Sequence, residues 1–115
     1  MSISVTEPHG ARAVKVNVTD AVLHVELSDG RTLTVPTVWY PRLTHGSNRE
    51  RSRWQLIGGG VGIHWPELDE DISVERLLAG RRSGETPESL KRWLSLRVSA
   101  RAGRPTKAMT RRSRR

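Results

Sequence analysis

The chain has 115 residues, with 20 Lys or Arg against 12 Asp or Glu and a formal net charge of +8. It contains no cysteine, which excludes disulfide bonds and thiolate metal sites and agrees with a reducing cytoplasm. No apolar run approaches the ~20 residues of a membrane span, and the first residues do not resemble a signal peptide. We therefore expect a cytoplasmic protein with one small folded domain and no membrane contact.

The charge is distributed unevenly along the chain. Residues 1–80 contain 8 basic and 10 acidic side chains, whereas residues 81–115 contain 12 basic and 2 acidic ones. No acidic residue occurs from Arg97 onward. A nearly neutral body with a strongly basic C-terminal part is typical of proteins that bring a folded domain to a polyanion or to an acidic partner.

The first third of the sequence predicts an antiparallel meander. Residues 1–13 show no periodicity, so we expect a flexible arm. Residues 13–18 alternate with their valines on one face, and residues 23–27 and 33–35 alternate in the same way, which predicts three strands with one apolar face. A hairpin connects the last two strands, where Gly30 can take a positive φ.

The next segment predicts a crossing element and a short helix. Pro41 suits the first position of a helix over residues 41–45, and the polar residues 46–53 are expected to form a surface loop or the end of that helix. Trp39, Trp54 and Trp65 are expected to fill the core, because large rings supply much apolar area in a small domain.

Residues 54–80 predict a hairpin followed by a short helix. Strands at 54–57 and 61–65 flank a flexible turn of three glycines, and Pro66 ends the second strand. The pattern therefore predicts an α+β domain over residues 14–80, with an antiparallel sheet of about five strands and short helices.

The acidic residues 69–71 are expected to begin the short helix. Asp71 or Ser73 can cap it, its apolar positions include Leu77, and Gly80 supplies a left-handed stop. Clustered acids also suit a hard metal ion, but the dipole of the helix already explains them.

A second helical segment follows in residues 81–101, after a linker at 81–85. Thr86 and Pro87 suit the start of an amphipathic helix. Counting from Leu90, apolar residues at i, i+3, i+4 and i+8 form one stripe. The cations on other faces of the helix are Lys91, Arg92, Arg97 and Arg101. The stripe either packs on the domain or binds a protein partner, and its residues are Leu90, Trp93, Leu94 and Val98.

Residues 102–115 have no core pattern and are expected to be a disordered basic tail. The segment 101–107 is weakly similar to an AT-hook, in which Gly-Arg-Pro lies along the minor groove, although Ala102 replaces the usual arginine before the glycine. A generic basic tail on phosphate is the simpler alternative. The candidate nucleic-acid-binding residues are Arg97, Arg101, Arg104, Lys107, Arg111, Arg112, Arg114 and Arg115.

Residues 14–80 also carry a combined pattern in three groups. The groups are Leu23-His24-Val25 with Asp29-Gly30-Arg31, then Val35-Pro36 with Trp39-Tyr40-Pro41-Arg42-Leu43, then Ile63-His64-Trp65-Pro66 with Leu68, Asp69, Asp71, Ile72 and Leu77-Leu78-Ala79-Gly80. This pattern resembles the bacterial domain-of-unknown-function family 2442. The resemblance implies a small α+β fold, and members of that family are often suspected of being antitoxins or transcription partners, sometimes joined to a helical DNA-binding segment.

The sequence contains no motif for catalysis, a cofactor or a metal: the histidines are not paired, and the three glycines lack the lysine of a phosphate-binding loop. We expect a non-enzymatic, DNA-associated accessory or regulatory protein, antitoxin-like, whose body binds a protein and whose tail contacts phosphate. The alternative is a protein-interaction subunit of a larger complex whose basic tail binds RNA or an acidic partner.

Overall fold

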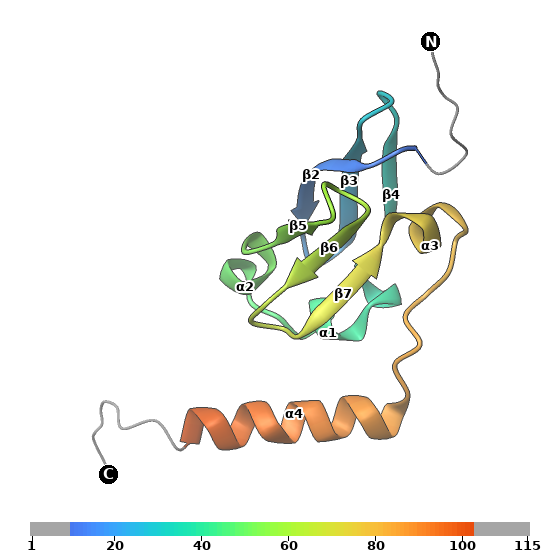
Figure 1. Ribbon diagram of the computed structural model, residues 1–115. Coiled ribbons are helices and arrows are strands. Elements are labelled where there is room, and N and C mark those ends of the chain that lie inside the picture. The colour runs from blue at the N-terminus through green and yellow to red at the C-terminus, as the bar shows by residue number, and fades with distance from the viewer. Residues whose placement is uncertain (1–9, 103–115) are drawn as a thin grey trace. The chain divides into compact units, whose positions relative to one another are not determined.

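The computed structural model describes residues 10–102. The chain divides into two compact units, residues 1–84 and residues 85–115 (Figure 1). We call the first unit the body and the second the C-terminal unit, and each is described by itself.

The body begins with the predicted antiparallel meander. Strands β2 (Ala13–Val18), β3 (Val22–Leu27) and β4 (Thr32–Pro36) form one sheet in the order β2-β3-β4. Strand β3 alternates as expected, with Leu23, Val25 and Leu27 buried on one face. The three-strand prediction is therefore confirmed.

The hairpin between β3 and β4 has the predicted turn residue. Gly30 has a φ of +93°. The Asp29 carboxylate accepts a hydrogen bond from the Arg31 backbone N–H at 3.1 Å. This bond, with the Arg31 side chain, holds the pKa of Asp29 below its ordinary value. The local sequence thus determines the turn.

Strand β2 does not place all its valines on one face. Its pairing with β3 slips between Ala13 and Lys15, and Val14 at this bulge is 53% exposed. Ala13 lies opposite Leu27 of β3, and its N–H donates to the Gly60 carbonyl at 2.8 Å, outside its own sheet. This contact from another part of the chain breaks the alternation, so that part of the prediction was wrong.

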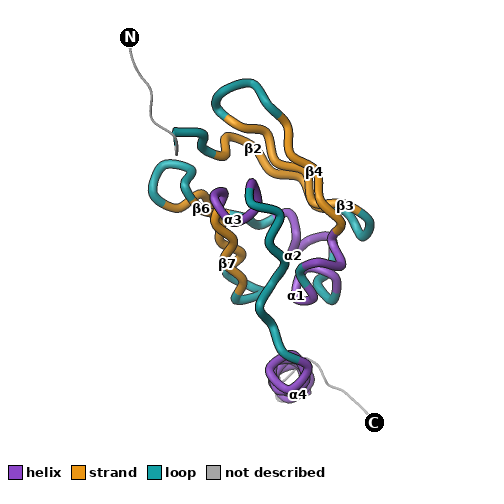
Figure 2. Tube along the Cα trace, turned by 90° about the vertical axis from the view of Figure 1, so that its right-hand side faces the viewer, coloured by secondary structure: helices purple, strands orange, loops and turns teal. Residues whose placement is uncertain are grey.

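The remaining strands form a second sheet. Strands β5 (Gln55–Ile57), β6 (Gly62–Trp65) and β7 (Glu70–Ser73) pair antiparallel in the order β5-β6-β7. One sheet of about five strands was therefore a wrong prediction, because the strands of residues 10–102 form two three-stranded sheets, which lie on opposite sides of the body in Figure 2. Strand β7 occupies the segment assigned to an acidic turn and helix cap, since Ile72 pairs with Ile63 and is buried.

The turn of three glycines connects β5 to β6 and also contacts β2 of the other sheet, through the hydrogen bond from Ala13 to Gly60. Gly58, Gly59 and Gly60 have φ values of +59°, +70° and +111°. A Cβ on Gly60 would lie 2.4 Å from the Ala13 carbonyl oxygen, closer than any real contact. The turn was expected to be a flexible connection, but its last residue is instead a point of close approach that only glycine allows.

Short helices follow the first sheet. They are η1 (Thr37–Trp39), α1 (Pro41–Thr44) and α2 (Asn48–Ser52). Pro41 is at the first position of α1, as predicted. The segment expected as a loop or helix end contains α2, which begins with a capping box in which Ser47 and Glu50 satisfy each other's backbone N–H groups.

Helix α3 (Val74–Leu78) closes the body. The Arg76 N–H donates to Ser73 Oγ at 3.1 Å, so Ser73 is the cap, whereas Asp71 lies in β7. Gly80 has a φ of +73°, as expected for a left-handed stop.

The core contains one tryptophan rather than three. Trp65 is fully buried, whereas Trp39 and Trp54 are half-buried. The Trp65 indole N–H donates to the Arg51 carbonyl at 3.0 Å. Both sheets, α1, α3 and the turn between β6 and β7 contribute the largest fully buried apolar side chains, which are Leu23, Val25, Leu43, Ile63, Trp65, Leu68, Val74 and Leu77.

The C-terminal unit contains the predicted helix, α4 (Pro87–Ala102). Thr86 caps it, because its Oγ1 accepts the Ser89 N–H at 3.0 Å. Within residues 10–102, no helix has both the length and the apolar character needed to cross a bilayer.

Candidate nucleic-acid and partner-binding surface

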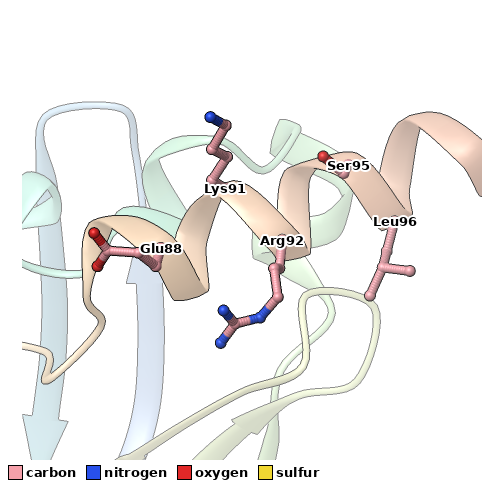
Figure 3. Close-up of a pocket in the computed structure, with 5 residues that line it drawn as sticks. All are labelled: Glu88, Lys91, Arg92, Ser95 and Leu96. Atoms are coloured by element: carbon pink, nitrogen blue, oxygen red, sulfur yellow. The ribbon is translucent and has the colours of Figure 1, made fainter.

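Helix α4 presents several cations of the basic region to solvent. Lys91 and Arg92 are exposed, and they project from the helix in different directions because neighbouring residues are 100° apart (Figure 3). Together with three other residues of α4 they line a hollow of about 500 Å³ along the helix. The other lining residues are Glu88, Ser95 and Leu96.

Arg97 does not lie on a face apart from the apolar stripe. Its guanidinium carbon is 4.7 Å from the centre of the Trp93 ring. Residues four apart share one side of a helix, so Arg97 stacks on Trp93 in a cation–π contact. The expected separation of Arg97 from the stripe was wrong, and this cation is held on an aromatic face.

The predicted stripe is uneven in exposure. Trp93 is buried, Leu90 and Leu94 are half-buried, and Val98 is 66% exposed. Leu96, which the sequence analysis left out, is 69% exposed. Leu96 lies two residues after Leu94, so a pattern of positions i, i+3 and i+4 does not include it. The exposed apolar residues lie in the second half of α4.

Part of the predicted nucleic-acid surface lies outside the described residues. Arg101 lies near the end of α4, and of residues 99–102 only the backbone is described. The weak AT-hook similarity begins at Arg101. The remaining candidates are outside the described residues, namely Arg104, Lys107, Arg111, Arg112, Arg114 and Arg115.

Two of the three consecutive acids of the body, Asp69 and Asp71, have different partners. Asp69, with a φ of +52°, is held by Arg42, whose Nη1 donates to the Asp69 carbonyl at 2.8 Å. Asp71 is hydrogen-bonded to His64 Nδ1. Among residues 10–102, no group of three or more His, Cys, Asp or Glu side chains could hold a metal ion.

The pairing of His64 with Asp71 was not predicted. The two residues are cross-strand partners on β6 and β7, and Gln55 is opposite His64 on β5. A carboxylate on Nδ1 fixes the orientation of the imidazole ring. Recognising β7 as a strand would have paired its residues with those of β6 and brought these two side chains together.

Two solved structures show the same fold. A protein of unknown function from Rhodospirillum rubrum ATCC 11170 is 30% identical, with a TM-score of 0.57 over 65% of this chain and 93% of that one. The uncharacterized protein CV0863 from Chromobacterium violaceum is 19% identical, with a TM-score of 0.55 over 70% of this chain and 74% of that one. No curated protein matches the chain.

The family assignment comes from the body. Residues 13–83 match the model of the family described as "Protein of unknown function (DUF2442)". The matched segment begins with the first residue of β2 and ends within the body, before α4. The family resemblance predicted from the sequence is therefore confirmed, and the chain belongs to the DUF2442 family.

Proposed function

We propose that this protein is a non-enzymatic, DNA-associated accessory or regulatory protein of antitoxin-like type. Its body and the apolar residues of α4 bind a protein partner, and the cations of α4 and the following segment contact the phosphate backbone. The proposal goes beyond the family, whose function is not known.

The observation that carries the proposal is the concentration of exposed positive charge on α4. Lys91 and Arg92 are exposed, and within residues 10–102 no ion pair or hydrogen bond joins either to a carboxylate. Glu88 is the last acid in the chain, so the charge along the rest of it is entirely positive. A continuous run of cations suits a polyanion, because binding releases condensed counterions.

The protein-binding part of the proposal is supported by exposed apolar groups. Leu96 and Val98 expose 69% and 66% of their surface on the same half of α4. Because residues two apart point to nearly opposite sides of a helix, the two side chains form separate apolar contacts for a partner rather than one patch.

The test is the salt dependence of duplex binding by the full-length protein. If about six cations contact phosphates, the log–log slope should be about −5. Lys91→Gln with Arg92→Gln should reduce its magnitude by about 1.8, because each phosphate contact contributes about 0.9. Lys15→Gln with Arg49→Gln removes the same charge from exposed positions of the body and should leave the slope unchanged.

Truncation provides an independent check. A variant that ends at Gly84 keeps the whole body. Equal binding by this variant and the full-length protein at low salt would contradict the proposal. Stronger binding to RNA or to an acidic polypeptide than to duplex DNA would favour the alternative, a subunit of a larger complex.

A further inference from the structure

The body has a net charge of zero but carries a local cluster of arginines. Residues 1–84 contain 10 basic and 10 acidic side chains. Three of the arginines occur within seven residues at its C-terminal end: Arg76 on α3, and Arg81 and Arg82 in the segment that follows. We call these three residues the arginine cluster. All three are exposed.

The turn after α3 brings the cluster together. Gly80, with a φ of +73°, donates its N–H to the Leu77 carbonyl at 3.0 Å, and the Arg81 N–H donates to the Arg76 carbonyl at 3.0 Å. These two bonds form a Schellman motif, which reverses the chain at the end of a helix. The turn therefore folds Arg81 back against the turn of α3 that carries Arg76.

The segment after the turn is fixed to η1 and to the start of α1. The Tyr40 hydroxyl donates to the Arg81 carbonyl at 2.8 Å, and the Ser83 N–H donates to the Trp39 carbonyl at 3.0 Å. The Arg82 guanidinium carbon is 5.0 Å from the centre of the half-buried Trp39 ring. The segment leaves α3 and runs past α1 in Figure 1.

Within residues 10–102, the cluster arginines lack the acidic partners that three other arginines of the body have, whereas Arg12 and Arg51 also lack them but donate to backbone carbonyls. Arg31, Arg42 and Arg53 each pair with a carboxylate, at distances from 2.8 to 3.4 Å. Among the described residues, none of the three cluster arginines forms such a pair. A favourable interaction with the dipole of α3 could account for Arg76 alone, because the other two lie beyond the helix.

We propose that the arginine cluster, with Trp39 beneath Arg82, is a second phosphate-binding surface, built into the body, and that it binds the same duplex as α4. This inference rests on the proposed function. Guanidinium forks suit phosphate oxygens. A duplex rather than a single anion is favoured because the cations continue along the chain at Lys91, Arg92 and Arg97.

The test uses the full-length protein and duplex DNA over a range of salt concentrations. Arg76→Gln, Arg81→Gln and Arg82→Gln together should lower the magnitude of the slope by about 2.7, the value for three phosphate contacts. The corresponding lysine variants keep the charge and should keep the slope, even if altered packing weakens binding. Lys15→Gln, Arg31→Gln and Arg49→Gln remove the same charge elsewhere in the body and should leave the slope unchanged.

The outcomes separate the two proposals. If the glutamine and lysine variants of the cluster both keep the wild-type slope while Lys91→Gln with Arg92→Gln reduces it, the cluster inference is overturned and the proposed function stands. If the wild-type protein does not bind the duplex at low salt, both are overturned. If an acidic polypeptide binds the cluster and duplex DNA does not, a protein partner replaces nucleic acid there.

Discussion

The body and α4 use arginine in opposite ways. Arg51 in α2 is 6% exposed, and its guanidinium donates to the Leu43 and Thr44 carbonyls at 2.8 and 2.9 Å. Arg92 on α4 is exposed, and within the described part of the chain no hydrogen bond or ion pair holds it. An arginine side chain therefore stabilises the fold in the body, whereas on α4 an arginine side chain is available to a ligand.

The comparison shows that net charge by segment is a poor guide to which cations are available. Arg51, together with Arg12, which donates to the Gly58 carbonyl at 2.8 Å, satisfies backbone groups of the body. The cluster arginines belong to the same unit but have no acidic partner among the described residues, where Arg76 makes one long hydrogen bond, to the Arg82 carbonyl at 3.5 Å. Bonding, rather than position in the sequence, separates structural arginines from candidate binding ones.

The largest effect should come from the contact that joins the two sheets. We expect Gly60→Ala to lower the free energy of unfolding by about 4 kcal/mol, because the new Cβ combines left-handed backbone strain with a severe clash. The clash is with the Ala13 carbonyl oxygen, 2.4 Å away. Urea unfolding followed by tryptophan fluorescence measures the loss.

Gly30→Ala is the matched control. Gly30 also has a positive φ, but a Cβ there would have no heavy atom within 4 Å. It should cost only about 1–2 kcal/mol, the strain of the left-handed backbone. Equal losses for the two variants would show that a Cβ at residue 60 meets no steric penalty from Ala13.

The next effect tests the two uses of arginine directly. Arg51→Ala should lower the free energy of unfolding by about 3 kcal/mol, because it leaves the Leu43 and Thr44 carbonyls without their buried donor. Arg92→Ala should change it by no more than about 0.5 kcal/mol, as expected for an exposed position. Chemical unfolding of both variants measures the two losses. Similar losses would show that Arg51 is no more important to the fold than Arg92.

Much of the fold follows from local patterns in the sequence. The alternation in β3, the positive φ of Gly30 and Gly80, the first position of α1 at Pro41 and the start of α4 after Thr86 depend on neighbouring residues. Local signals therefore place most strands and helix ends.

The errors occur where a distant contact determines the structure. The bulge at Val14 depends on the bond from Ala13 to Gly60, and β7 depends on pairing of Ile72 with Ile63. Trp39 is half-buried, and the residue that stacks on its ring is the distant Arg82. Neither spacing nor composition specifies these contacts.

The candidate site was predictable to a lesser degree. The charge asymmetry of the sequence includes the cations of α4, but the stacking of Arg97 on Trp93 was missed. The arginine cluster was assigned partly to a linker, because the Tyr40–Arg81 bond spans 41 residues of sequence. Heptad or alternation patterns do not reveal a contact of that range.

A smaller loss than that of Arg51→Ala should come from Tyr40, which holds the segment after α3 in place. Tyr40→Phe removes the hydrogen bond to the Arg81 carbonyl and should lower the free energy of unfolding by about 1 kcal/mol. The same variant should also weaken duplex binding if the arginine cluster contacts phosphate. Ser47→Ala, which removes a cap from α2, is a control of similar cost that leaves this segment in place.

Tyr40 also predicts a loss of stability at high pH. Burial raises the pKa of Tyr40 above its ordinary value, while the charge of Arg76 opposes that shift. Because the folded state favours the neutral phenol, this stabilisation is complete below the unfolded pKa of about 10 and is lost as pH rises through the folded pKa. Tyr40 is the only tyrosine in the chain, so phenolate absorbance reports its ionisation alone. Wild-type stability should therefore fall more steeply in this range than that of Tyr40→Phe, and parallel pH profiles would contradict a buried, hydrogen-bonded Tyr40.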